Sequence, residues 1–455
     1  MKRRDFLINA GLLASATSMI GGFDILKAAE MSAPRNTIEG PYDSLDAGLQ
    51  QPLTAVVIGA GSRGTIYASY AEAFPGSFKI VGVSDINDFR KERTGKQYSI
   101  DRKHRFGDWS EVFAVPKFAD IAIITTPDNL HYEPCMKALE MGYHVLLEKP
   151  VAQTEQQCRD ILAQSRKYGR IVAICHVLRY APFYIEMRKM VQSGAIGDML
   201  SIQHLEPVGH IHMSHSFVRG HWRNSKQTNP MIISKSCHDL DILRWIVDKP
   251  CKSVSAFGRQ SYFMANNAPA GSAARCLDCS VERECIFSAK KIYYDRRSWL
   301  TFDLSGNKET EGEEIMEQLR TGPYGRCVFH CDNDQCDHYA MNMEFEDGIT
   351  VAFSLEAMTS YDGRLTRIMG TKGDIVGDMR TFTHTDFLTG KQTVWESPAT
   401  DGHGGGDHRL VRDFLLAVCN EDESMLTSTV EASLESHIMG FRAEKSRMDK
   451  TVEML

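Results

Sequence analysis

Short apolar runs alternate with helical patterns along the first half of the chain. The runs are rich in β-branched residues, as expected of strands that are buried on both faces. They lie at Ala55–Ile58, Lys79–Ser84, Ala119–Thr125, Tyr143–Leu147 and Ile171–Cys175. Between them, apolar residues recur at the spacing of an amphipathic helix. This alternation predicts a doubly wound parallel sheet, in which ligands bind at the carboxyl ends of the strands.

From Met199 onward, apolar and polar residues alternate with a period of two, as in strands with one buried face. Such segments lie at Met199–Pro207, Lys252–Tyr262, Met341–Phe345, Ile349–Leu355, Arg364–Met369 and Asp374–Asp378. Asp347-Gly348, between two of them, predicts a tight hairpin. Helical patterns cover Ile232–Val247 and Val430–Arg447, and we expect the second helix to pack back on the first domain. The predicted fold is α/β: a doubly wound parallel sheet, then an α/β domain with a large open, mainly antiparallel sheet.

The N-terminus has the pattern of an export signal. Lys2–Arg4 is basic, Ile8–Phe23 is apolar, and the small residues Ala28–Ala29 offer a cleavage site. This predicts a twin-arginine signal at 1–30 and a linker at 31–51. The expected location is periplasmic, with no stable membrane anchor after export. An uncleaved, membrane-attached segment is the alternative.

Composition narrows the class of protein. The chain has 455 residues, 42% of them hydrophobic and 24% charged, which is typical of a soluble protein with two domains. Its formal charge of −7 gives no reason to expect a nucleic-acid partner.

The first apolar run is followed by a glycine-rich turn and a helical pattern. The turn reads Gly59-Ala60-Gly61-Ser62-Arg63-Gly64. Its three glycines permit a tight turn, close approach of a pyrophosphate, and close packing of helix on strand. The residues that open the helix, Ser62 and Arg63, would face the phosphates. A glycine-rich turn without a ligand is the alternative, but the strand before and the helix after favour a dinucleotide site.

An acidic residue, Asp85, ends the second apolar run. Its carboxylate would accept a hydrogen bond from the ribose 2′-OH and repel a 2′-phosphate, which favours NAD over NADP. The nearby Arg90 weakens this preference, because a guanidinium attracts phosphate.

Several further motifs occur in a fixed order along the chain. They are Thr126-Pro127-Asp128 with His131, Glu148-Lys149-Pro150, Arg179-Tyr180 with Pro182, Gly194–Gly197, His238 with Asp241, and Ser436-His437 with Ser446-Arg447. Together with the glycine-rich turn, they resemble the Gfo/Idh/MocA family of NAD(P)-dependent sugar oxidoreductases. The resemblance implies a Rossmann domain at 52–178 and a substrate and oligomerisation domain at 179–455. It also implies a homodimer or homotetramer, and cofactor contacts from Thr126, Pro127, His131, Glu148 and Lys149.

The same resemblance implies two catalytic residues. Lys149 would lie beside the nicotinamide and the reacting carbinol, where a cation stabilises the developing alkoxide; an ion pair with Glu148 is the alternative. His238 would handle the proton, with Asp241 orienting its imidazole and Ser234 on the same helix face. A histidine of the core is the alternative for His238. Many relatives carry Asp where this chain has Ser234, so the usual Lys-Asp-His set is incomplete.

Other polar residues are candidates for binding a polyhydroxylated substrate. Trp222 can stack on a sugar ring, and the guanidinium groups of Arg179 and Arg223 can donate in a fork. His403 lies in a glycine-rich loop that serves either the substrate or the start of a helix capped by Asp407. The histidines between the first strand of the second sheet and the helix at Ile232–Val247 suit substrate contacts better than Zn²⁺, because their spacing is irregular; they are His210, His212, His215 and His221.

Cysteines gather in two short stretches of the second domain. They are Cys276, Cys279 and Cys285, then Cys327, Cys331 and Cys336. The first five suit a structural Zn²⁺ site, or less well an iron–sulfur cluster. Disulfides are the alternative, because an exported protein can form them.

The leading hypothesis is an exported oxidoreductase that carries tightly bound NAD and acts on a sugar or sugar derivative. The second is a glycosidase with bound NAD that oxidises its substrate transiently, eliminates the aglycone, adds water and reduces the product again. The third is a cofactor-binding protein without catalysis, supported by Ser234 alone.

Overall fold

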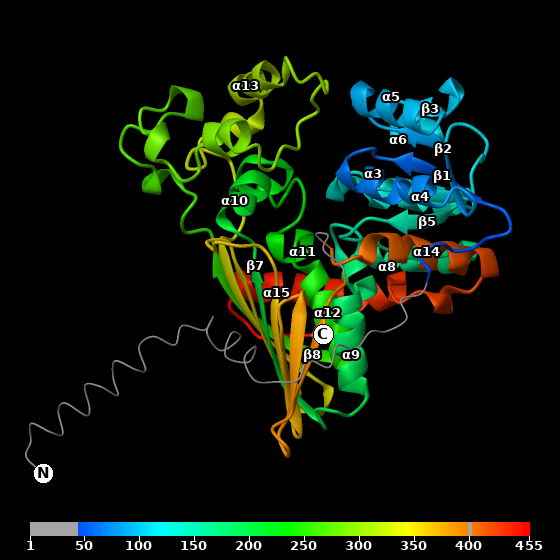
Figure 1. Ribbon diagram of the computed structural model, residues 1–455, viewed down its shortest axis with the longest axis vertical. Helices are drawn as coiled ribbons and strands as arrows, with labels where there is room; N and C mark the ends of the chain where they lie inside the picture. The colour runs from blue at the N-terminus through cyan, green and yellow to red at the C-terminus, as the bar shows by residue number, and fades with distance from the viewer. Residues whose placement is uncertain (1–43, 399–402) are drawn as a thin grey trace, which may run out of the picture.

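The computed structural model describes residues 44–398 and 403–455. The predicted export signal and most of the predicted linker lie outside these residues. Within them, no helix combines the length and apolar character needed to cross a membrane. Figure 1 shows two sheets, each with its own helices.

The first sheet is parallel throughout, as predicted, with the strand order β3-β2-β1-β4-β5-β6. Its strands are β1 Leu53–Ile58, β2 Phe78–Ser84, β3 Arg105–Phe106, β4 Ile121–Ile124, β5 His144–Leu147 and β6 Val172–Ile174. Its helices are α3 Ser62–Ala68, α4 Tyr70–Ala73, α5 Asp88–Gln97, α6 Trp109–Val112, α7 Tyr132–Glu140 and α8 Glu155–Tyr168. The order reverses between β1 and β4, so ligands are expected at the carboxyl ends of these two strands.

The second sheet is mixed and mainly antiparallel, also as predicted, with the order β14-β13-β12-β11-β7-β10-β9-β8-β15. Only β7 and β10 pair in parallel. The strands are β7 Met199–Pro207, β8 Cys251–Arg259, β9 His338–Phe345, β10 Thr350–Glu356, β11 Leu365–Gly370, β12 Gly373–Gly377, β13 Thr381–Asp386, β14 Gln392–Glu396 and β15 Glu453–Met454. The sequence pattern missed β13, β14 and β15. The predicted hairpin is present, with positive φ at both Asp347 (59°) and Gly348 (76°).

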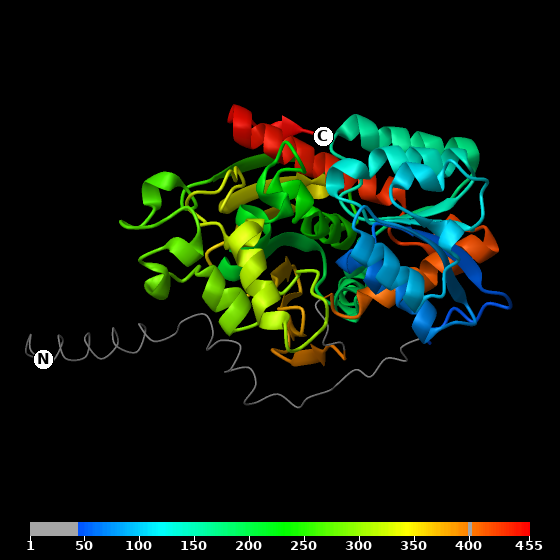
Figure 2. The same ribbon diagram turned by 90° about the horizontal axis from the view of Figure 1, so that it is seen from above.

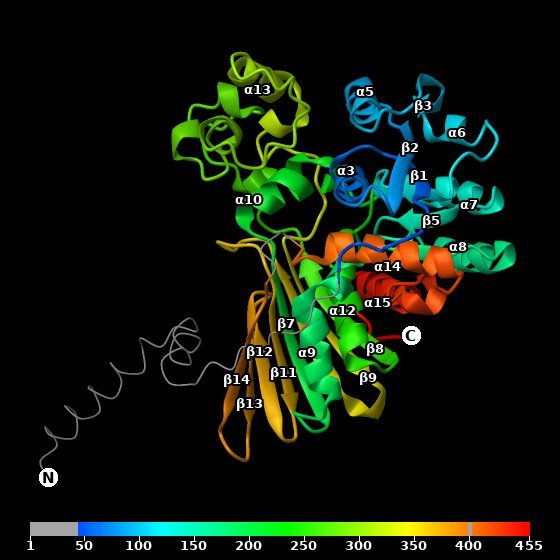
Figure 3. The same ribbon diagram turned by 45° about the vertical axis from the view of Figure 1, so that its right-hand side comes forward.

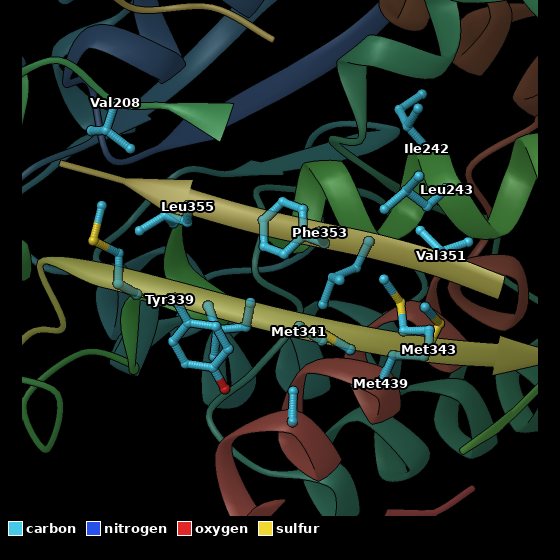
Figure 4. Close-up of a cluster of buried hydrophobic side chains, with 14 of the residues drawn as sticks. Val208, Ile242, Leu243, Tyr339, Met341, Met343, Val351, Phe353, Leu355 and Met439 are labelled. Atoms are coloured by element: carbon cyan, nitrogen blue, oxygen red, sulfur yellow. The ribbon is translucent and has the colours of Figure 1, made fainter. Parts of the chain in front are cut away.

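Helices cover one face of this sheet (Figure 3). They are α9 Pro182–Gln192, α12 Cys237–Val247 and α15 Val430–Asp449. Burial alternates strictly along β9, so every second side chain points into the core. Figure 4 shows Met341, Met343 and Phe353 of the sheet gathered with Leu243 of α12 and Met439 of α15. Among the described residues, no helix covers the opposite face of the sheet.

The predicted helix at Ile232–Val247 is interrupted. It forms α11 Met231–Ser234 and α12, with Lys235 and Ser236 between them. Both of these residues reach a buried carboxylate on β7, Glu206: the Ser236 hydroxyl donates to it at 2.6 Å, and the Lys235 ammonium lies 3.2 Å from it. The break therefore coincides with a polar anchor to the sheet, which helical periodicity does not reveal.

Residues 260–337, between β8 and β9, form an insert that the sequence pattern did not predict. It contains helix α13 Glu311–Thr321 and a small core of its own that includes Ile292, Tyr293 and Ile315. The insert faces α5 across the molecule (Figures 1 and 2). Asp303 of the insert bonds Arg90 of α5 at 2.9 Å and thereby joins the two domains.

The C-terminal part of the chain returns to the first domain. Helix α14 Gly406–Asn420 places Leu410 and Phe414 in the core beneath the parallel sheet. Helix α15 packs against α8, where Arg442 pairs with Glu155 at 3.1 Å. The cofactor domain is thus completed by residues from the end of the chain.

Candidate active site

The glycine-rich turn leaves room for a pyrophosphate. Gly59 has φ +95°, and a Cβ there would lie 2.6 Å from the Thr125 carbonyl oxygen. A Cβ at Gly64 would lie 2.1 Å from the Gly59 carbonyl oxygen, so neither position accepts a side chain. On Gly61 the nearest atom would be a guanidinium nitrogen of Arg90 at 3.6 Å. No side chain caps the N-terminus of α3 and no acid lies in its first turn, so the site fits an anionic phosphate.

Asp85 supports this turn from the end of β2. One carboxylate oxygen accepts from the Ala60 N–H and the other from the Asn87 N–H, both at 2.8 Å. Each oxygen retains a lone pair for a ribose hydroxyl. The positive charge of Arg90 is paired with the carboxylate of Asp303. Asp303 also accepts a hydrogen bond from the side-chain amide of Asn87 at 2.9 Å.

Glu148 pairs with Arg63 and not with Lys149. The Arg63 Nε donates to Glu148 at 2.7 Å, and its Nη2 donates to Asp407 at 2.6 Å. The His403 ring contacts both Arg63 (3.2 Å) and Asp407 (3.1 Å). Asp407 is therefore not the N-cap of α14, a place taken by Gly405. This network joins the glycine-rich helix, the end of β5 and the start of α14.

Lys149 extends from the end of β5 toward the second domain. Its Nζ donates to the Ser234 carbonyl oxygen at 2.7 Å. Across residues 44–398 and 403–455, no carboxylate lies within ion-pair distance of this ammonium. The ion pair with Glu148, which the sequence left open, does not form. Lys149 retains two N–H groups for a substrate oxygen.

His238 opens α12 and lies beside this ammonium. The side chain is 6% exposed, and its Nδ1 has no hydrogen-bond partner. Its ring centre is 5.8 Å from that of His176 and 6.1 Å from that of His403. Burial, and then the positive charge of Lys149, hold the pKa of His238 well below its usual range. The imidazole is therefore neutral and can accept a proton.

Asp241 does not orient His238, contrary to the prediction. Its carboxylate receives two hydrogen bonds from Arg179, at 2.6 and 2.7 Å. Both side chains are almost completely buried. Arg179 also donates to backbone carbonyls of Thr427 and Ala432. The pair thus joins three segments of the core, and neither residue is available to a substrate.

Three further predicted ligands are engaged in contacts within the protein. The Trp222 indole N–H donates to Asp128 at 2.9 Å, and Arg223 binds Asp332 of the insert at 2.8 Å. Both ring nitrogens of His131 contact carbonyl oxygens, those of Pro150 (2.7 Å) and Thr126 (2.8 Å). Trp222 and His131 therefore position the loops after β4 and β5, whereas Arg223 holds the insert. Pro127 caps the turn that begins with Asp128.

The predicted histidine group does not converge. His210 contacts the Thr359 carbonyl, and His215 bonds the Tyr293 hydroxyl at 2.9 Å; burial lowers the pKa of His215 to about 4. Within the described residues, no three His, Cys, Asp or Glu side chains are arranged to hold a metal ion.

His212 is the member of that group that faces the site. It bonds Asp362 at 2.8 Å and lies 4.4 Å, ring to ring, from Trp299 of the insert. Its pKa is lowered by burial, with contributions from the charges of Lys235 and Lys149. Those charges therefore face the same space as His212. Asp362 and Trp299 belong to no motif, so sequence analysis could not single them out.

Buried neutral histidines predict loss of stability at mildly acidic pH. The pKa is lowered for His144 (to about 4), His176, His215 (to about 4), His238 and His437, mainly by burial. Below pH 6.5, which is about the pKa of histidine in the unfolded chain, these side chains bind protons in the unfolded chain but not in the folded chain. The free energy of unfolding then falls by about 1.4 kcal/mol per pH unit for each group. We expect the Tm to be level above pH 7 and to fall between pH 6.5 and 5. An unchanged Tm over that interval, measured by calorimetry, would contradict the assignment.

Curated relatives and solved structures support the same fold. YteT of Bacillus subtilis (strain 168), an oxidoreductase by name, is 24% identical over 366 residues, 76% of this chain and 84% of YteT. The inositol 2-dehydrogenase/D-chiro-inositol 3-dehydrogenase of Lactiplantibacillus plantarum is 24% identical over 220 residues, 47% of this chain and 57% of that protein. The chain thus matches little more than half the length of that relative. The inositol dehydrogenase homolog complexed with NAD⁺ from Azotobacter vinelandii superimposes with a TM-score of 0.68 at 16% identity, covering 91% of this chain and 100% of that one.

Two family models match adjoining parts of the chain. "Oxidoreductase family, NAD-binding Rossmann fold" matches residues 53–176, and "Oxidoreductase family, C-terminal alpha/beta domain" matches residues 188–454. Together they cover most of the described structure, including the glycine-rich turn, Lys149 and His238. The chain therefore belongs to the Gfo/Idh/MocA family of NAD-binding oxidoreductases.

Proposed function

We propose that this oxidoreductase transfers a hydride between nicotinamide and a secondary carbinol of a sugar or sugar derivative. The inositol dehydrogenases among its relatives support a polyhydroxylated substrate. The side chains around Lys149 also support a polyhydroxylated substrate, because His212, His238 and Lys235 offer hydrogen-bonding groups for hydroxyl oxygens.

The observation that carries the proposal is the pairing of Lys149 with His238. Lys149 donates to a single carbonyl, and His238 is neutral with an unused ring nitrogen. The ammonium stabilises the alkoxide that develops as the C–H bond breaks, and a neutral imidazole can receive the hydroxyl proton. When bound, NAD supplies the carbon that accepts the hydride.

A panel of sugars, polyols and p-nitrophenyl glycosides tests the proposal against its alternatives. Oxidation of a carbinol forms NADH, which is followed by its absorbance, whereas glycoside cleavage releases nitrophenol. The proposal expects an NADH signal with at least one member of the panel. Nitrophenol release without net NADH would favour the glycosidase, and no response to any member would favour a binding protein.

The contacts around Asp85 favour NAD over NADP. Asp85 and Asp303 place two carboxylates near the ribose position, and Asp303 forms an ion pair with Arg90 at 2.9 Å. A 2′-phosphate would meet two negative charges, and the Arg90 guanidinium is already paired with a carboxylate. The insert also contacts this end of the cofactor site through Asp303, which supports slow release of the nucleotide.

Export with bound cofactor leads to a direct prediction. The N-terminal pattern supports the twin-arginine route, which carries folded proteins to the periplasm, where free NAD is scarce. We expect NAD to remain bound through purification and gel filtration. Nucleotide content and the ultraviolet spectrum of the purified protein measure this. Folded protein that contains no nucleotide and binds added NAD only at millimolar concentration would contradict it.

The bare face of the second sheet supports a homo-oligomer. Its outward side chains on β9 and β10 alternate with the buried ones and carry no covering helix. A self-complementary open sheet face suits a symmetric dimer or tetramer. Light scattering is expected to give at least twice the chain mass of 51.1 kDa. The monomer mass at micromolar concentration would contradict the assembly.

A further inference from the structure

Four cysteine side chains from two distant stretches of the insert line one small cavity. They are Cys276, Cys279, Cys285 and Cys327, and none of them forms a disulfide. The other lining residues are half apolar and half polar; they include Val281 and Phe329 on the one side and Arg219 and Glu282 on the other. Cys331, the fifth residue of the predicted metal set, does not line the cavity; its thiol donates to the Cys327 carbonyl at 3.2 Å.

The size of the cavity suits a single ion. The space open to the centre of a water-sized sphere is about 20 Å³. That is close to the volume that one water molecule needs, which is roughly 10–15 Å³ on the same measure. An iron–sulfur cluster, with several metal and sulfide atoms, requires far more room.

A buried arginine lines the same cavity without a counter-charge. Arg219 is 0% exposed, and no carboxylate pairs with it in the described part of the chain. Its Nε donates to the Arg326 carbonyl (2.7 Å) and its Nη2 to the Phe287 carbonyl (2.6 Å). Nη2 also lies 3.5 Å from the Cys276 sulfur, and Nη1 is buried with no partner.

A buried cation of this kind is costly unless negative charge lies beside it. Four neutral thiols supply none, and the Glu282 carboxylate, which also lines the cavity, accepts from the Ser288 hydroxyl and forms no ion pair with Arg219 among the described residues. Four thiolates around one Zn²⁺ carry a net charge of −2, which a neighbouring guanidinium offsets while it donates N–H bonds to sulfur. One thiolate-bound Zn²⁺ would therefore account for both the thiol cluster and the unpaired arginine.

We propose that Cys276, Cys279, Cys285 and Cys327 bind one structural Zn²⁺ as thiolates, with Arg219 as the buried counter-charge. Each thiol gives up its proton when the metal binds, and no electron is transferred. The thiols do not converge at ligand distances in the structure, so binding requires their side chains to turn inward. The Cys-x₂-Cys spacing of Cys276 and Cys279 suits this geometry.

The metal would fasten the insert to the active-site side of the molecule. It joins Cys276–Cys285 to Cys327, and Asp332, shortly after Cys327, bonds both Arg326 (2.7 Å) and Arg223 (2.8 Å). Trp222, next to Arg223, bonds Asp128 of the cofactor domain. The site is therefore structural and lies outside the hydride-transfer machinery.

Metal analysis of the full chain, purified without chelator, tests the proposal. We expect about one zinc ion per chain, with four thiols that react with Ellman's reagent only after the metal is displaced. Folded protein with less than about 0.2 zinc ions per chain, whether its cysteines are free or in disulfides, would overturn the proposal. About four iron atoms per chain would overturn the single-ion assignment.

Variants test the ligand set. Cys279→Ser and Cys285→Ser should each reduce zinc below about 0.2 per chain, whereas Cys331→Ser and the exposed Cys419→Ser should retain about one. Arg219→Met should release zinc to a colorimetric chelator at least about tenfold faster than Arg219→Lys, which keeps the charge. Zinc loss from the two control cysteine variants, or equal release from both arginine variants, would contradict the assignment. If a ligand variant fails to fold, the metal content of the wild-type chain still decides.

Discussion

Lys149→Met is expected to lower kcat by about a hundredfold or more while leaving the affinity for NAD nearly unchanged. The substitution preserves the length of the side chain and removes the ammonium. In the structure that ammonium bonds only the Ser234 carbonyl, so its remaining N–H groups are directed to a substrate oxygen. A hundredfold loss corresponds to about 2.7 kcal/mol of transition-state stabilisation. Steady-state kinetics and titration of NAD binding measure the two quantities separately.

Lys137→Met is the matched control. Lys137 lies on α7 of the same domain and pairs with Glu140 on the surface at 2.7 Å. We expect its kinetics to equal those of the wild-type chain. If Lys149→Met retained activity within about threefold of wild type, Lys149 would have no part in the proton and charge chemistry proposed above.

Asp241→Asn is expected to reduce the free energy of unfolding by about 3–5 kcal/mol. In the wild-type structure the Arg179 guanidinium donates two hydrogen bonds to the Asp241 carboxylate, at 2.6 and 2.7 Å. The substitution leaves this guanidinium buried without a negative partner. Because Asp241 does not contact His238, the folded variant should keep the pH dependence of kcat. Denaturant unfolding measures the first effect, and a pH–rate profile the second.

Asp248→Asn provides the control on the same helix. Asp248 pairs with Arg188 at 2.9 Å on the surface, where an ion pair contributes about 0–1 kcal/mol. The double variant Arg179→Met/Asp241→Leu should recover much of the lost stability, since apolar groups replace both charges. A stable Asp241→Asn variant with an altered pH–rate profile would restore the original prediction that Asp241 orients His238.

The strands and the cofactor turn could be predicted because their signals are local. A β-branched run followed by Gly59, Gly61 and Gly64 specifies a strand, a turn and a helix within one short segment. Asp85 was found in the same way, since it directly follows a predicted parallel strand, whereas the role of Lys149 was implied by the family resemblance. The edge strands β14 and β15 and the neighbouring strand β13 were missed because they are short or polar and bury few side chains.

The partners of the site residues could not be predicted, because they come from distant segments. Helical spacing places Asp241 one turn after His238, but the structure shows that its partner is Arg179, which lies 62 residues earlier in the chain, before α9 and β7. Arg63 similarly takes Glu148 from β5 and Asp407 from α14. Asp303 and Trp299 belong to the irregular insert, where no periodicity marks a functional residue.

Transfer of deuterium from carbon to nicotinamide tests the central claim most directly. The full chain would be incubated with NAD and sugars or polyols that carry deuterium on their carbinol carbons, and the nicotinamide recovered would be analysed by mass spectrometry. The account predicts that at least one substrate gives NADH one mass unit heavier than the unlabelled form, and that Lys149→Met gives none in the same time. Recovery of unlabelled nucleotide from every substrate, by wild-type protein that binds NAD, would contradict hydride transfer from a sugar carbinol.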